Sequence, residues 1–197
     1  MNTAKAELSN KISIEYDLIV EELTMSLDWL NKSKDYTFLD SLKLTFTDNT
    51  YDKFLAQAIY STSEIEFSLN GATARTFQAT IIHEIAHHIS FSYLGIRGHT
   101  LEFAIINYAL YYKFNQDANT FFRSYDIAQD KAFPFLSINS FLFDAMIKNI
   151  TFVDLTELSL KAQELAKSIR ENSIPLNLSK TITYEDKNEQ SPHLKVA

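Results

Sequence analysis

Apolar residues near the start of the chain recur at spacings of mostly three and four positions among acidic residues, which is typical of an amphipathic helix. These apolar positions are Ile12, Ile14, Leu18, Ile19, Leu23 and Leu27. The pattern predicts one helix over residues 3–30, and the polar residues 31–35 are expected to end it.

The pattern then changes to an alternation with a period of two, which is typical of a half-buried strand. Residues 38–48 alternate in this way, with one face formed by Leu42, Leu44 and Phe46. Two more short strands are expected in residues 56–63 and 64–71. The second of these ends in an Asn-Gly pair, which signals a turn.

From residue 72 onward the apolar spacing is helical. Helices are expected over residues 72–94, 99–114, 117–132, 137–150 and 154–171. The polar residues from 173 onward are expected to form a flexible tail. The chain is therefore predicted to be an α+β protein with one domain at 1–172 and a tail at 173–197. This domain would contain an N-terminal helix, a small three-stranded sheet and a mostly helical C-terminal part.

Composition narrows the class of protein. The chain has no cysteine, which excludes a disulfide framework and a cysteine-based zinc ribbon. Its net charge of −7 and scattered basic residues argue against strong nucleic-acid binding. The N-terminus lacks the apolar core of a signal peptide, and no apolar run approaches the roughly 20 residues of a membrane span. A cytoplasmic protein without membrane contact is expected.

Candidate chemistry is concentrated in the stretch TIIHEIAHHISF, which holds three of the five histidines in the chain. His83 and His87 lie one helical turn apart, so their imidazoles can bind one metal ion from the same face. Glu84 can then take a proton from a metal-bound water, and H-E-x-x-H is a known metalloprotease signature. The flanking positions are largely apolar, and burying these polar groups unpaired would cost several kcal/mol. A metal site is therefore favoured over a helix with a solvated polar face.

A catalytic zinc needs a third protein ligand and an open position for water. His99 is the first candidate, because the helix that it begins can turn back over the site, and Glu102 is the competitor one turn later. His88 lies about 100° round the helix from His87. It is expected to be a surface histidine or one that supports the ligands. His193 lies in the tail and is expected to be solvated.

This arrangement resembles the SprT-like family, which includes the Spartan-type proteases. In that family, short strands ending in an I-x-L-S-like segment precede the H-E-x-x-H helix, and a third histidine follows in an H-G-x-x-F/W setting. Here EIEFSLN precedes the helix and GHTLEF follows it, so the resemblance covers residues 42–112. Thr100 stands where the family usually has glycine.

The resemblance implies a zincin-like fold in which His83, His87 and His99 bind Zn²⁺ and Glu84 is the general base. Phe103 would pack the helix after the third histidine against the core. The implied function is that of a zinc metallopeptidase that hydrolyses peptide bonds of a protein substrate. The alternatives are a catalytically inactive zincin-fold protein with a binding or regulatory role, and a helical domain with a chance motif.

Two details of such a mechanism stay open. A second donor to the oxyanion would help peptide hydrolysis. The nearby candidates are Tyr60, Tyr93, Arg97, Tyr108, Tyr111 and Tyr112. The strand EIEFSL is also expected to be a sheet edge that pairs with an extended peptide.

Overall fold

The structure is a computed structural model, which describes residues 3–27, 32–49, 55–70, 77–117 and 145–172. The helix predicted over 117–132, most of the one predicted over 137–150, and the tail from 173 lie outside these ranges. Within them the chain is an α+β protein that is mostly helical and has a three-stranded mixed sheet, as predicted.

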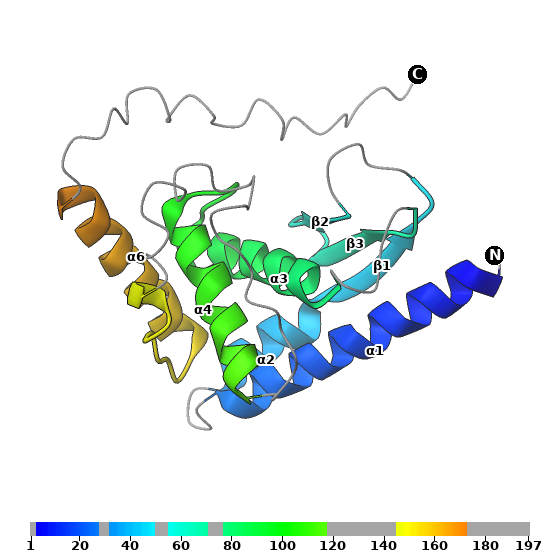
Figure 1. The fold of residues 1–197 in the computed structure, drawn as a ribbon, viewed down its shortest axis with the longest axis horizontal. Helices are drawn as coiled ribbons and strands as arrows, with labels where there is room; N and C mark the ends of the chain where they lie inside the picture. Colours follow the sequence, from blue (N-terminus) through cyan, green and yellow to red (C-terminus); the bar gives the residue numbers. More distant parts are fainter. Residues whose placement is uncertain (1–2, 28–31, 50–54, 71–76, 118–144, 173–197) are drawn as a thin grey trace, which may run out of the picture.

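Helix α3 (Phe77–Leu94) lies at the centre of the molecule (Figure 1). The sheet lies on one side of it, and α4 (Leu101–Asp117) and then α6 (Leu155–Asn172) lie on the other. Helix α1 (Thr3–Ser26) runs along this core and contacts α3, α4 and the first strand. The sequence predicted helices at the positions of α1, α3, α4 and α6, because the apolar residues of these segments recur with helical spacing.

One stripe of α1 faces the core. It consists of Ile12, Tyr16, Ile19 and Leu23. Ile14 and Leu18 also belong to the apolar pattern, but they are 52% and 49% exposed. At 3.6 residues per turn these two positions point away from the buried stripe. The packed face of α1 is therefore narrower than the sequence pattern indicates.

Helix α2 (Lys32–Ser41) was missed, because residues 31–35 were expected to end α1 and residues 38–48 to form a strand. Its Asp35 is buried and accepts hydrogen bonds from the Tyr93 hydroxyl and, at 2.9 Å, from the Leu155 backbone N–H. These partners lie at the end of α3 and the start of α6. Helix α2 is held by contacts distant in sequence, which a local propensity does not report.

The sheet consists of β1 (Lys43–Thr47), β2 (Ala56–Ile59) and β3 (Glu64–Ser68), in the order β1-β3-β2. Strand β1 is parallel to β3, and β2 is antiparallel to it. All three strands were predicted, but the expectation that EIEFSL forms an edge is wrong, because β3 is the central strand. The residues Ile65 and Phe67 on β3 are fully buried. The edge strand that packs on α3 is β2.

Candidate metal centre

Helix α3 holds His83 and His87 in fixed positions because it is buried on most sides. The residues Ile81, Ile82, Ile85 and Ile89 are at most 1% exposed. They anchor the helix between α1, α4, α6 and the sheet. Its polar patch is thereby held on one face, with His87 buried and His83 partly exposed.

A short turn brings His99 back over that face. Gly95 ends α3 with a φ of 69°, and its N–H donates to the Phe91 carbonyl at 2.9 Å. This is a glycine-terminated helix end in the left-handed conformation. Thr100 then begins α4, and its side-chain oxygen accepts from the Phe103 N–H at 3.3 Å. Thr100, which departs from the family pattern, is therefore the N-cap that sets the start of the next helix.

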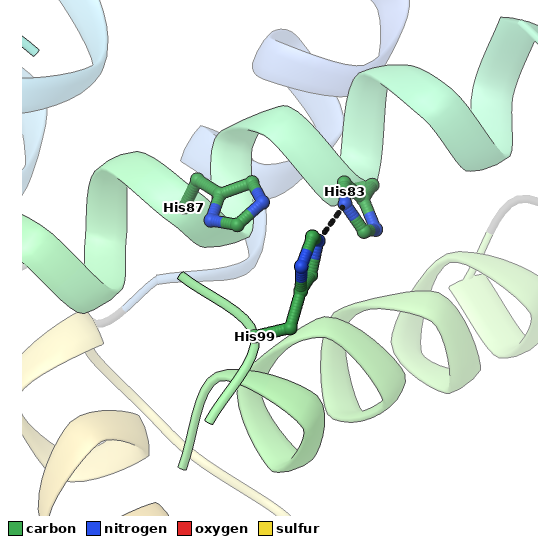
Figure 2. Close-up of side chains that lie close together, drawn as sticks. All are labelled: His83, His87 and His99. Atoms are coloured by element: carbon green, nitrogen blue, oxygen red, sulfur yellow. Dashed lines mark hydrogen bonds between the residues drawn. The ribbon is translucent and has the colours of Figure 1, made fainter. Parts of the chain in front are cut away.

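The three predicted histidine ligands converge between α3 and the start of α4 (Figure 2). Their candidate ligand atoms all lie within 4.8 Å of one another, and Nε2 of His83 is 3.0 Å from Nε2 of His99. Two nitrogens bound to one tetrahedral zinc at about 2.0–2.1 Å lie about 3.3 Å apart. The group could therefore hold a metal ion after small side-chain movements. His99 is exposed, which leaves the cluster open on one side.

Phe103 forms an apolar floor under the cluster. Its ring stacks on His87 with centroids 4.0 Å apart and meets the rings of His83 and His99 edge-on at 5.0 and 5.1 Å. It is fully buried, which confirms that it packs α4 against the core. The three imidazoles therefore have an apolar wall on one side, which restricts their rotation and excludes water there.

Burial keeps the histidines of α3 neutral. It lowers the pKa of His83 to about 3, and the neighbouring charge of His99 contributes to this shift. Burial also lowers the pKa of His87 well below its ordinary value, with further contributions from His83, His99 and His88. Metal binding requires neutral imidazoles with a free nitrogen lone pair. At neutral pH these two histidines are therefore in the form that a metal ion needs.

Tyr60, which follows strand β2, is the oxyanion candidate that lies against the cluster. Its hydroxyl is 3.4 Å from Nδ1 of His87, the position from which a partner orients a ligating imidazole. Tyr93 is directed elsewhere, because its hydroxyl donates to Asp35. Tyr108 and Tyr111 line a small pocket beside His83, and Tyr112 contacts Tyr111.

Glu102, the alternative third ligand, is engaged with α6. Its two carboxylate oxygens accept from the Arg170 guanidinium at 2.5 and 2.8 Å. Burial alone would raise the pKa of Glu102, but the hydrogen bonds and charge of Arg170 outweigh it and lower the pKa. Of the two candidates, the structure brings His99 and not Glu102 together with His83 and His87.

The remaining predicted residues are also placed. Glu84 is buried within α3, at 5% exposed. His88 is buried and its Nε2 lies 2.9 Å from the Glu64 carbonyl oxygen of β3, so it is not a surface histidine. It links α3 to the central strand. His193 lies outside the described residues.

Two residues near the site were missed by sequence reasoning. Arg170 is 68 positions from Glu102, and nothing local indicates their pairing. Asn107 is 6% exposed and lines a pocket with Ala79, His83, Tyr108 and Tyr111. Its signal was available, because it is a polar residue within the apolar run FAIINYAL and lies one turn after Phe103.

No family model, curated protein or solved structure matches this chain. The chemistry of the site is therefore inferred from its own residues.

Within the described ranges, no helix is both long and apolar enough to cross a membrane.

Proposed function

We propose that the protein is a zinc-dependent peptidase with a zincin-like site of the SprT-like kind. The observation that carries this proposal is the convergence of His83, His87 and His99 around one point, with Glu84 beside the first of them. Three imidazoles with an open fourth position are a catalytic donor set for zinc. No sulfur ligand is available in the chain, which disfavours a purely structural zinc site of the cysteine type.

When bound, zinc would supply Lewis-acid activation of a water molecule and of the peptide carbonyl. The chain's own residues do the rest. Glu84 accepts the proton of the attacking water and returns it to the leaving amine. Its buried carboxylate lies one residue after His83, so the helix that carries the ligands also places the base. Tyr60 would help to orient His87 through the contact between its hydroxyl and Nδ1.

A peptide substrate would bind along strand β2. Within the described residues β2 pairs only with β3, so its other edge can accept the backbone of an extended chain. Strand β2 packs on α3 and leads directly into Tyr60, which contacts His87. This edge replaces the β3 edge expected from sequence, and the residue that follows it, Tyr60, contacts His87.

The test is the metal content of the purified protein after dialysis, by elemental analysis, for the wild type and His99→Ala. We expect near-stoichiometric zinc in the wild type and much less in the variant. His88→Ala is the matched control, because His88 is a buried histidine of the same helix but is not one of the three that could hold the ion, and the variant should keep its zinc. No zinc in any of the three proteins, even after reconstitution, would overturn the proposal. Zinc without cleavage of any protein would point to the inactive binding protein instead.

A further inference from the structure

An exposed cation lies beside the proposed site. Arg97 is in the turn between α3 and α4, and its side chain reaches over two aromatic rings. Its guanidinium carbon is 5.5 Å from the ring centroid of Tyr60 and 4.9 Å from that of Phe91. Tyr60 in turn contacts His87. The Arg97 guanidinium therefore lies over Tyr60, the residue whose hydroxyl contacts the proposed metal ligand His87.

The position of Arg97 is defined by its surroundings. The ring centroids of Tyr60 and Phe91 lie 4.6 Å apart, so the two rings form one continuous aromatic surface under Arg97. The turn itself is bounded by Gly95 and Gly98, with φ of 69° and 77°, and Gly98 is buried. A guanidinium stacked on aromatic rings uses its faces, so its N–H donors stay directed outward in the plane. Arg97 is exposed and lies over both rings, so its N–H donors can reach a group that binds beside Tyr60.

Within the described part of the chain, no ion pair includes Arg97. The pairs found there involve Lys5, Lys161, Lys167 and Arg170. The protein carries a net charge of −7, so its overall field repels anions. A single fixed guanidinium next to the site is the feature that would attract an anionic group to that place. Its planar donors match a carboxylate in a bidentate geometry.

We propose that Arg97 binds a carboxylate of the peptide substrate, so that the peptidase prefers acidic peptides. The inference rests on the proposed function and names its substrate class. The distances through Tyr60 put the guanidinium at most about 12 Å from Nδ1 of His87, or roughly four residues of extended chain at about 3.3 Å each. The carboxylate would therefore lie within about four residues of the cleaved bond. It can come from an Asp or Glu side chain or from the C-terminus of the peptide.

The test uses a synthetic peptide library with randomised positions, made once with free and once with amidated C-termini. Zinc-loaded wild type, Arg97→Glu and Lys148→Glu are incubated with both libraries, and the cleaved bonds are mapped by mass spectrometry. Lys148→Glu is the control, because Lys148 is exposed and its substitution makes the same change of charge away from the histidine cluster. We expect Asp or Glu to be enriched at one position in the wild type and the control. In Arg97→Glu that preference should disappear or change to Lys or Arg.

For one acidic peptide, Arg97→Ala should lower kcat/KM about two- to fivefold, the range for an ion pair of an exposed side chain. A preference lost on amidation alone would identify the C-terminal carboxylate as the source. Cleavage with no acidic preference, or with one unchanged in Arg97→Glu, would overturn the inference and leave the peptidase standing.

The same libraries, immobilised, are probed for retention of zinc-loaded Glu84→Gln with and without Arg97→Glu. If the wild type cuts nothing but acidic peptides retain the protein through Arg97, the peptidase proposal fails and carboxylate binding stands. If acidic peptides are neither cut nor retained, both fail.

Discussion

Glu84 is the proposed general base, so its substitution should separate metal binding from catalysis. It is 5% exposed and belongs to the same helix as two of the three histidines. Glu84→Gln keeps the size of the side chain and removes its basicity. We expect the variant to retain zinc and to lose peptide cleavage by about 10²- to 10⁴-fold, the usual contribution of a general base. Elemental analysis and a peptide-cleavage assay on the same sample measure both. Retained activity would show that Glu84 is not the base.

Phe103 contacts all three imidazoles and is also buried in the core. Its replacement should therefore affect both zinc binding and the stability of the fold. Phe103→Leu should cost about 1–2 kcal/mol of unfolding free energy. It should also weaken zinc binding, because the ring that stacks on His87 at 4.0 Å is lost. Competition with a zinc-binding chelator dye gives the affinity, and urea denaturation gives the stability.

Phe67 supplies the matched control for this prediction. It is equally buried, but it lies on β3 and contacts Phe77 rather than the histidines. Phe67→Leu should show a similar stability loss with unchanged zinc affinity. If both variants bind zinc equally, the stacking on His87 has no part in holding the metal.

Helix α6 is tied to the start of α4 by the pair of Glu102 and Arg170. Glu102 is 8% exposed and lies three residues after His99, so the pair holds the end of α4 that carries the third histidine. Arg170→Ala would leave a buried carboxylate without its cation. We expect a stability loss of about 1–2 kcal/mol, kept modest because the Arg170 side chain is 51% exposed. Zinc affinity should fall several-fold as His99 loses its fixed position.

Lys167→Ala is the control for that helix. Lys167 pairs with Glu171 at 3.8 Å, with both side chains more than 60% exposed, so its loss should change neither stability nor zinc affinity. Chemical denaturation and zinc titration of the two variants provide the comparison. Equal behaviour of Arg170→Ala and Lys167→Ala would show that α6 does not support the site.

The stability of the whole metal-free molecule should depend on pH through the buried histidines. The pKa of His83 in the folded chain is about 3, below its ordinary value of 6.5. Between these pH values the unfolded chain binds a proton that the folded chain does not, so the free energy of unfolding falls as the pH drops below about 6.5. His87 contributes with the same sign.

Urea denaturation of chelator-treated protein between about pH 7 and pH 4.5 tests this dependence, because the unfolded His pKa of 6.5 lies inside that range and the folded value of about 3 lies below it. In His83→Gln the slope should be shallower, since one of the protons is no longer taken up on unfolding. Equal slopes in wild type and variant would show that His83 is not held neutral by the fold.

Local patterns in the sequence were sufficient for much of this protein. The three- and four-residue spacing placed α1, α3, α4 and α6, and alternation placed β1 and β3, because both signals reside in neighbouring residues. The spacing in HEIAH put two histidines on one helical face for the same reason. His99 was selected from the glycine-flanked turn that precedes it, and the structure brings it to within 3.0 Å of His83.

Apart from Asn107, the features that were missed depend on contacts between residues distant in the chain. Helix α2 is held by Asp35, whose partner Leu155 is 120 positions away. The central place of β3 follows from pairing with two other strands, and a strand's own residues do not specify which neighbours it has. The ion pair that directs Glu102 away from the cluster joins residues 68 positions apart. The spacing of residues along one helix determines which side chains share a face. Which other helices and strands pack against that face is decided only by the tertiary structure.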